Sequence, residues 1–355
     1  MKSLSRRTFL TRSIALTGAA LLPPSLLSES TKTRLILLGT GGGPRPRKAS
    51  SASAQVIVSN KIAYVIDCGN GVARQLAFAN VPLTGLRHIF VTHHHSDHNA
   101  DYGNLIWLAW ASGLSTRVDT WGPPPLESMT KLFFQMNAFD IDTRIKNEGR
   151  VPLEPLVHVH ERSEGGQVMQ DENVRVTATL VDHPPVVPAF AYRFDAADRS
   201  IVISGDTRPC DNLLKLARGA DVLVHSALYV PGVDRLVARV PNAPALKASI
   251  LAHQTSAEDA GRAAQAAGVK TLVLSHLVRP LMIRKSPTRC GLTQRVHIFA
   301  APSSLAKIYS RSEPMSRAAD RTPTASDTEA AVCAASPYRC DGLATSHSLP
   351  AADDP

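Results

Sequence analysis

Cysteine is scarce in this sequence, and its spacing is uninformative. The 355 residues contain five cysteines, and no two form a Cys-x-x-Cys pair. This pattern argues against a thiolate-rich structural zinc site, and the odd number argues against a disulfide framework. A disulfide between Cys333 and Cys340 stays open if the protein works in an oxidising compartment.

Aromatic residues are also few, although the chain is basic. Phe, Trp and Tyr together make up 5% of the residues, while the net charge is +9 and the pI is about 9.5. A basic chain is a candidate for nucleic-acid binding, but no array of interleaved aromatic and basic side chains is present for base stacking. Part of the positive charge lies in the first 12 residues and part after residue 280. We therefore expect no nucleic-acid partner.

The sequence has no apolar run that is long enough for a stable membrane span. A short apolar stretch at residues 14–22 follows Ser5-Arg6-Arg7-Thr8-Phe9-Leu10, which resembles the bacterial twin-arginine export motif. The resemblance implies that residues 1–30 are an export signal for the twin-arginine machinery. We expect the mature protein to be periplasmic or secreted.

The most informative segment is residues 92–98, Thr-His-His-His-Ser-Asp-His. It places four potential metal ligands within six residues: His93, His95, Asp97 and His98. The preceding residues 89–92 are apolar and β-branched, so these ligands should follow the end of a buried strand. Imidazole and carboxylate groups together suit zinc or a similar divalent ion.

This motif resembles the signature of the metallo-β-lactamase superfamily of hydrolases. Further segments match the family's pattern in the same order along the chain, and they contribute Asp67, which would brace the site, His183, Asp206 and His276. The resemblance covers residues 33–279. Residues 38–44 and 204–209 resemble, more narrowly, the ribonuclease Z and arylsulfatase branch.

The resemblance implies a site for two divalent metal ions, with zinc as the expected metal. His93, His95 and His183 would hold the first ion, and Asp97, His98 and His276 would hold the second. Asp206 would bridge the two. Two such ions lower the pKa of a shared water toward about 7, which gives a hydroxide nucleophile.

Three of these residues have an alternative role when each is taken alone. His183 precedes two prolines and suits a loop, Asp206 precedes a helix and suits an N-cap, and His276 ends an apolar strand. Their ordered combination favours the metal site.

The resemblance also implies two catalytic residues, Asp97 and His253. His253 precedes a predicted helix that begins near Thr255 or Ser256, and in relatives this histidine can protonate the leaving group. A surface histidine beside the helix is the alternative. Ser226 stands where relatives often carry a glutamate, so the carboxylate that would orient His253 is missing.

The order of strands and helices suits an α/β fold, a four-layer αββα sandwich over residues 31–300. Strand patterns occur at residues 34–38, 55–59, 62–67, 88–92, 117–121, 173–181, 190–194, 200–204, 221–225 and 271–275. Helix patterns occur at residues 71–79, 101–112, 126–138, 211–218 and 256–267. Residues 301–355 have the composition of a low-order tail. Near the C-terminal end of the expected domain, after residue 280, the only apolar segment that suits a last strand is the short run at residues 296–300.

The spacing of the ligands bears on the substrate. Ribonuclease Z usually inserts a long basic arm between the counterparts of His183 and Asp206, which here are only 23 positions apart. We therefore expect an exported, arylsulfatase-like hydrolase of small sulfate or phosphate esters. Trp107, Trp110 and Trp121 are expected in the core or at the mouth of its pocket.

Two alternatives stay open. One is a ribonuclease Z-like phosphodiesterase or endoribonuclease, and the other is a catalytically impaired metal-binding protein. A homodimer is also left open.

Overall fold

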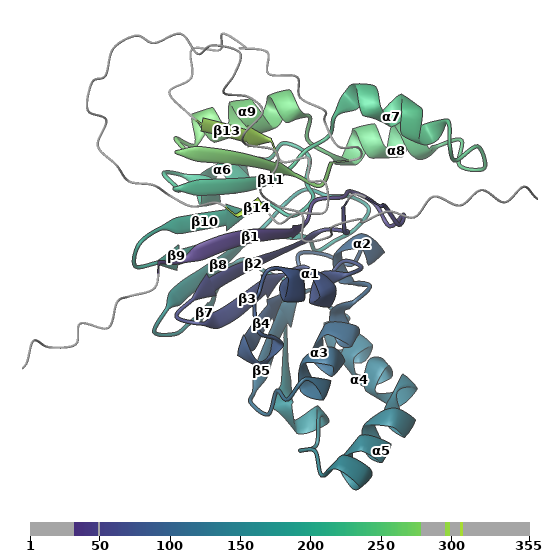
Figure 1. The fold of residues 1–355 in the computed structure, drawn as a ribbon. Helices are drawn as coiled ribbons and strands as arrows, with labels where there is room; N and C mark the ends of the chain where they lie inside the picture. The colour runs from purple at the N-terminus through teal and green to yellow at the C-terminus, as the bar shows by residue number, and fades with distance from the viewer. Residues whose placement is uncertain (1–31, 49, 278–294, 299–305, 308–355) are drawn as a thin grey trace, which may run out of the picture. The chain divides into compact units, whose positions relative to one another are not determined.

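Two β-sheets, each of seven strands in the described residues, form the centre of the fold (Figure 1). The computed structural model describes residues 32–48, 50–277, 295–298 and 306–307, all within the unit Met1–Tyr309. The expected export signal and nearly all of the expected tail lie outside these residues. So do Cys333 and Cys340.

The first sheet has the order β14-β1-β2-β3-β4-β5-β6. Its first strands pair in antiparallel fashion, and β3 to β6 pair in parallel. The strands are β1 (Arg34–Gly39), β2 (Ala54–Ser59), β3 (Ile62–Ile66), β4 (Leu86–Phe90), β5 (Val118–Gly122), β6 (Val157–Glu161) and β14 (Ala306–Lys307).

The second sheet has the order β13-β12-β11-β10-β9-β8-β7. It repeats the same scheme, because β7 to β10 pair in antiparallel fashion and β10 to β13 pair in parallel. The strands are β7 (Gly166–Gln170), β8 (Val174–Leu180), β9 (Phe190–Ala196), β10 (Ser200–Ile203), β11 (Val222–Ser226), β12 (Thr271–Ser275) and β13 (Arg295–Ile298).

Side chains from both sheets form a shared apolar core between them. Phe90 of β4 contacts Tyr192 and Phe194 of β9 edge-on, with ring centroids 5.4 and 5.1 Å apart. Successive residues of a strand point to opposite faces, so Ile57 of β2 enters this core while Val56 packs on the outer face. Both are fully buried, which explains why the strand reads as a continuous apolar run.

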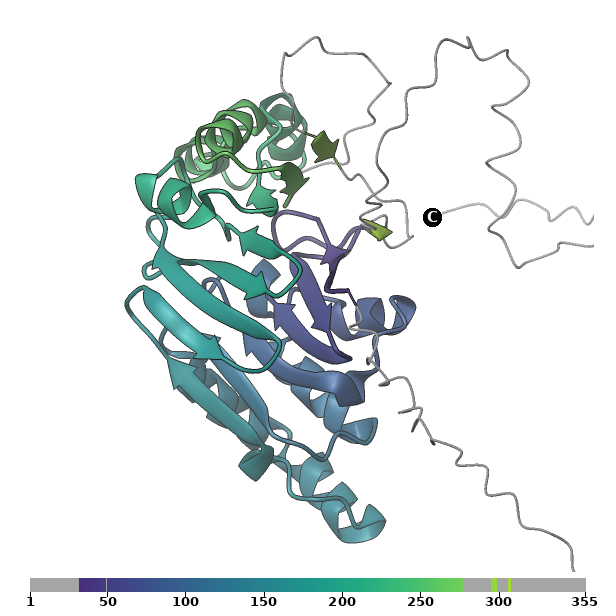
Figure 2. The ribbon, with the colours of Figure 1, turned by 90° about the vertical axis from the view of Figure 1, so that its left-hand side faces the viewer.

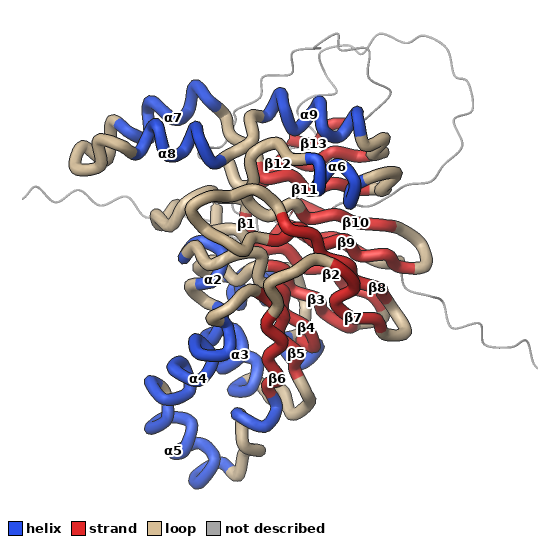
Figure 3. The backbone as a smooth tube through the Cα atoms, turned by 180° about the vertical axis from the view of Figure 1, so that it is seen from behind, coloured by secondary structure: helices blue, strands red, loops and turns tan. Residues whose placement is uncertain are grey.

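Helices cover the outer face of each sheet (Figures 2 and 3). The first sheet packs against α1 (Val72–Phe78) and α3 (Tyr102–Ala111), with α4 (Leu126–Met136) and α5 (Ala138–Glu148) beyond them. The second sheet packs against α6 (Asp211–Ala217) and α9 (Ala257–Ala266). These layers confirm the predicted four-layer αββα sandwich.

Three short helices lie near the edge where the strands of both sheets end: α2 (Ser96–Asn99), α7 (Val230–Val237) and α8 (Leu246–His253). Two 3-10 turns, Leu83–Gly85 and Glu154–Leu156, complete the connections. In the described part of the chain, no helix is long and apolar enough to cross a membrane.

The sequence patterns located ten strands and five helices but missed several elements. The predicted elements do not include α5, α7, α8, β6 or β7, although the residues of β6 alternate between apolar and polar. The apolar run at residues 296–300 does contribute a strand, because β13 pairs in parallel with β12. The sheet is therefore extended by this strand, which we had not predicted.

The inter-sheet core predicts a strong dependence of stability on Phe90. Phe90→Ala should lower the free energy of unfolding by about 3–5 kcal/mol, because it removes a fully buried ring and leaves a cavity. The matched control is Phe139→Ala on α5, whose ring is 88% exposed and whose loss should cost less than about 0.5 kcal/mol. Urea unfolding of both variants measures the difference, and equal losses would contradict the assigned core.

Candidate metal centre

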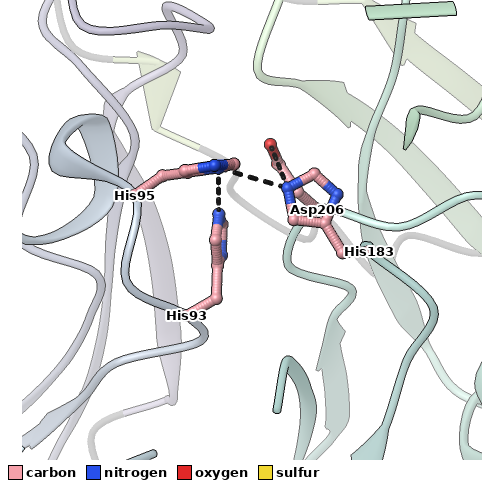
Figure 4. Close-up of side chains that lie close together, drawn as sticks. All are labelled: His93, His95, His183 and Asp206. Atoms are coloured by element: carbon pink, nitrogen blue, oxygen red, sulfur yellow. Dashed lines mark hydrogen bonds and ion pairs between the residues drawn. The ribbon is translucent and has the colours of Figure 1, made fainter. Parts of the chain in front are cut away.

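The candidate site forms where strands of the two sheets end side by side. In the first sheet, His93 to His98 follow β4. In the second sheet, Asp206 follows β10, and His276 follows β12. His183 comes from the loop after β8. Figure 4 shows that His93 and His95 approach from one side and His183 and Asp206 from the other.

One group of ligand atoms consists of His93, His95, His183 and Asp206, all within 4.8 Å of one another. The Nδ1 atom of His95 lies 3.1 Å from Nε2 of His93 and 3.2 Å from Nε2 of His183. The Oδ2 atom of Asp206 lies 4.0 Å from Nε2 of His183. Three imidazole nitrogens and one carboxylate therefore point at a common position.

A second group consists of Asp97, His98 and His276. The Nε2 atom of His276 lies 3.0 Å from Oδ2 of Asp97 and 3.2 Å from Oδ2 of Asp206. The Nε2 atom of His98 lies 3.5 Å from Oδ1 of Asp206. Asp206 thus lies between the two groups, and the structure brings all seven predicted residues together.

A second layer of hydrogen bonds orients the imidazole rings. Asp67 accepts hydrogen bonds from the backbone N–H of Thr92 (2.8 Å) and from Nδ1 of His98 (2.6 Å). The hydroxyl of Thr92 donates to Asp67 and lies 3.0 Å from Nδ1 of His93. The backbone carbonyl of His253 lies 3.0 Å from Nδ1 of His183. With these nitrogens engaged, the opposite ring nitrogens are directed into the centre, as metal-binding histidines require.

The backbone around the centre adopts rare conformations. Asp67 and His276, both just after strand ends, have φ angles of 59° and 58°. Non-glycine residues rarely occupy this left-handed region, and such strain clusters at functional sites. Gly42 passes so close to His276 that a Cβ atom would lie 2.5 Å from its carbonyl oxygen. The glycine-rich loop at residues 39–43 therefore allows the chain to pass directly beside this ligand.

Most of the pKa shifts favour the protonation states that metal ligands need, whereas the shift of His98 favours its protonated form. Burial lowers the pKa values of His93, His95 and His183, which favours neutral imidazoles. Burial opposes ionisation of Asp206, but the nearby charges of His276 and His98 outweigh it and hold its pKa well below the ordinary value. Burial also opposes protonation of His98, but Asp206 and Asp67 outweigh it and raise its pKa well above the ordinary value.

These residues fit divalent ions. The Nε2 atom of His98 is buried and has no hydrogen-bond partner, although it faces two carboxylates. The electrostatic field that favours a proton on His98 also favours a metal cation at the same place. Five imidazoles and two carboxylates form a nitrogen and oxygen set that suits zinc and neighbouring transition metals.

A cavity of about 300 Å³ opens onto the centre. Asp97, His183, Asp206 and His276 lie in its wall together with the more exposed His95, while His93 and His98 lie outside its lining. The rest of the wall comes from residues 42–45 on one side and from α7 and α8 on the other.

None of the three tryptophans lines this cavity. Trp110 is buried in the core outside the first sheet, Trp107 packs against the same core, and Trp121 packs between the sheets. Of the two places expected for them, the core is therefore confirmed and the mouth of the pocket is wrong. Their apolar rings contribute more to stability inside the core than they would at an open rim.

His253 lies at the last position of α8 and lines the cavity. Its Nδ1 atom is 3.4 Å from the hydroxyl of Ser249, one helical turn earlier. The next helix, α9, begins at Ala257, and its N-cap is Ser256, one of the two predicted residues, whose side chain accepts a hydrogen bond from the backbone N–H of Asp259. Asp206 is not an N-cap, because Cys210 occupies that position before α6.

Three contributors to the site escaped the sequence analysis. The backbone N–H of Gly43 donates to Oδ2 of Asp97 at 2.6 Å. Gln254 and Ser226 each donate to a different oxygen of Asp206, at 2.7 and 2.8 Å. A backbone group carries no sequence signal, and Ser226 was noted only as a missing glutamate.

Comparison with known proteins agrees with this geometry. Residues 63–277 match the family described as "Beta-lactamase superfamily domain". The chain is 34% identical over 247 residues to "Ribonuclease Z" of Mycobacterium sp. (strain KMS), which covers 69% of this chain and 84% of that protein.

Two solved structures share the fold at lower identity. The metallo-β-lactamase fold protein YhfI from Bacillus subtilis has a TM-score of 0.56 and 19% identity, covering 78% of this chain and 99% of that one. Human tRNase Z, short form, has a TM-score of 0.55 and 21% identity, covering 77% of this chain and 98% of that one.

The two ligand groups predict the metal content. Protein purified without chelator should contain about two equivalents of a divalent metal, and Asp206→Ala should retain fewer, because it removes the carboxylate shared by both groups. Elemental analysis measures this directly. Asp142→Ala, which removes an exposed carboxylate on α5, serves as the control and should keep the wild-type content. A well-folded wild-type protein with one equivalent or none would rule out the paired site.

Proposed function

Because this chain belongs to the metallo-β-lactamase superfamily of hydrolases, in its ribonuclease Z branch, we propose that it is a phosphodiester hydrolase that depends on two divalent metal ions, with zinc the best fit. The observation that carries the proposal is the shared carboxylate. Asp206 lies within reach of both ligand groups, as a two-metal hydrolase needs.

The metal ions, when bound, supply the positive charge that polarises a phosphoryl group and makes water a stronger acid. The residues of the chain do the rest. His93, His95 and His183 would hold one ion, and Asp97, His98 and His276 would hold the other. The backbone N–H of Gly43 donates to Oδ2 of Asp97 and fixes this carboxylate in the cavity wall, where it would help to orient the attacking water.

The cavity has two chemically different sides. Leu236 of α7 and Leu246 and Ile250 of α8 form an apolar wall. Arg45 lies in the wall formed by the glycine-rich loop and offers a positive charge to an anion. The volume of about 300 Å³ fits a phosphate with one apolar substituent under α7 and α8. We infer that the natural substrate is a small diester, or one end of a larger one.

The relatives favour phosphodiesters over sulfate esters. The similar mycobacterial protein carries the name ribonuclease Z, and a ribonuclease of this kind cleaves phosphodiester bonds. Nothing in the cavity selects sulfate over phosphate, so our initial expectation of an arylsulfatase has less support than a phosphodiesterase.

Processing of tRNA precursors is the second candidate, and the mycobacterial and human relatives are the reason to test it. One structural feature argues against it. Between His183 and Asp206 the chain forms only β9 and β10 and their short connection. A long polyanion needs many positioned Lys and Arg contacts, and this stretch offers no projecting arm to carry them. An exported location, expected from residues 4–10, would also separate the protein from tRNA precursors.

The proposal predicts a substrate order. Metal-loaded protein should hydrolyse bis-nitrophenyl phosphate far faster than nitrophenyl sulfate, and it should leave the 3′ end of a tRNA precursor intact. Steady-state kinetics on the two chromogenic esters and gel analysis of the RNA test this. Asp97→Ala should abolish most of the diesterase activity, and Asp142→Ala is the control for a general loss of negative charge.

Different outcomes separate the candidates. Faster cleavage of the tRNA precursor than of every small ester would favour the ribonuclease. Sulfate hydrolysis above diester hydrolysis would favour an arylsulfatase. Metal-loaded protein without activity on any of them would support a binding protein instead.

His253 is proposed as the proton donor to the leaving group. His253→Ala should lower kcat on a dinucleoside monophosphate by about 10²- to 10⁴-fold, because an alkoxide leaving group needs a proton. The loss on bis-nitrophenyl phosphate should be much smaller, since nitrophenolate leaves without one. His158→Ala, an exposed histidine on β6, is the matched control. Equal losses on both substrates would show that His253 does not act as the acid.

A further inference from the structure

Two neutral side chains hold the two oxygens of the buried Asp206 carboxylate. The hydroxyl of Ser226, at the end of β11, donates to Oδ1 at 2.8 Å. The Nε2 amide of Gln254, directly after α8, donates to Oδ2 at 2.7 Å. Asp206 is only 2% exposed, so solvent cannot replace these donors.

The lone-pair sites of the Asp206 carboxylate can be assigned to the groups that surround it. A carboxylate offers about two lone-pair sites on each oxygen. On Oδ1, one site faces Ser226 and the other side faces His98 and the second ligand group. On Oδ2, one site faces Gln254 and the other side faces His183 and His276. Each oxygen thus has one hydrogen-bond donor and one side that faces the ligand groups.

The chemistry of the two donors matters as much as their position. A carboxylate can only accept hydrogen bonds, so the amide of Gln254 must present its N–H side to Asp206. A carboxylate at residue 226 would bring a second negative charge to the place where Ser226 touches Asp206. The serine and the glutamine add hydrogen bonds without adding charge.

The backbone fixes Gln254 firmly at this place. The carbonyl of the preceding residue, His253, lies 3.0 Å from Nδ1 of His183. The hydroxyl of the next residue, Thr255, donates to the carbonyl of Thr207 at 2.6 Å. Residues 253–255 are therefore held by contacts to His183 and to Thr207, which directly follows Asp206. The amide of Gln254 between them has little freedom to move away.

We propose that Gln254 and Ser226 are positioning residues that hold the Asp206 carboxylate in the orientation that bridges two metal ions. This role rests on the proposed function, because it needs the paired metal site. It assigns a purpose to Ser226, which the sequence indicated only as the place of a missing carboxylate, and it gives Gln254 a role that no motif indicated.

The test compares the metal affinities of Gln254→Met and Ser226→Ala with that of the wild type. Gln254→Met keeps the approximate size of the side chain but removes the donor. Each variant should need about 10- to 100-fold more free Zn²⁺ for half-loading, which is typical when a residue supporting a metal ligand is lost. Gln265→Met on the exposed face of α9 and the exposed Ser115→Ala are the matched controls. Titration against a buffered series of free Zn²⁺ gives the affinities.

Two further measurements separate positioning from a general loss of structure. The visible absorption of the Co²⁺-loaded protein should change in both variants, because it reports the arrangement of ligands around the ion. Thermal unfolding of the metal-free proteins shows whether either variant has lost its fold, and Ser226→Ala carries the test if Gln254→Met does not fold.

Affinities within about twofold of the wild type, with an unchanged Co²⁺ spectrum, would overturn the role of Gln254 and Ser226 and leave the proposed function intact. Wild-type protein that binds no Zn²⁺ would overturn the proposed function and this role together. Lower affinity in both variants beside normal affinity in both controls is the result we expect.

Discussion

The concentration of buried charge between the two sheets is the constraint on which the rest of the structure depends. Asp97, His98 and Asp206 are almost completely buried and lie within a few ångströms of one another. Isolated charges are costly in such surroundings, and unpaired imidazole nitrogens are costly too. A pair of divalent cations removes both costs at once. The strand ends and the left-handed residues Asp67 and His276 bring these groups together, and the glycine-rich loop packs directly beside His276.

Two successive layers of support fix the ligands. Asp67 lies outside the ligand groups, yet it holds both Thr92 and His98. Its own backbone N–H donates to the carbonyl of Phe90 in the neighbouring strand, at 2.8 Å. The pairing of β3 with β4 and the core beneath these strands therefore fix the position of the metal ligands. Precise placement of this kind is what distinguishes a hydrolytic centre from a loose cluster of histidines.

Much of this could be predicted from the sequence, for identifiable reasons. Residues 92–98 and the strands that precede Asp206 and His276 carry their signal locally, as an apolar run followed by a ligand. The helices α7 and α8 do not, because they pack by a few residues each and leave most of their surface exposed. Gln254 could not be found either, since its partner lies 48 positions away and only the fold joins them. The tryptophans could not be assigned to one place from the sequence, because a large ring suits both a core and a pocket wall, and the structure places them in the core.

The segment between Leu228 and Thr255 contains α7 and α8 and forms the apolar wall of the cavity. Its two ends lie next to each other in the fold. Leu228, before α7, donates its backbone N–H to the carbonyl of Thr255, after α8, at 2.8 Å, and it accepts from Ala257 at 3.1 Å. The residues between them form a long loop with two helices whose ends are joined by these hydrogen bonds. The length of this loop therefore does not alter the pairing register of β11 and β12. Lengthening such a loop costs free energy only slowly, about 0.6 kcal/mol for each doubling. Descendants of this chain could therefore vary residues 229–252, which carry the apolar wall, and acquire new substrates, while His253, Gln254 and both sheets stay as they are.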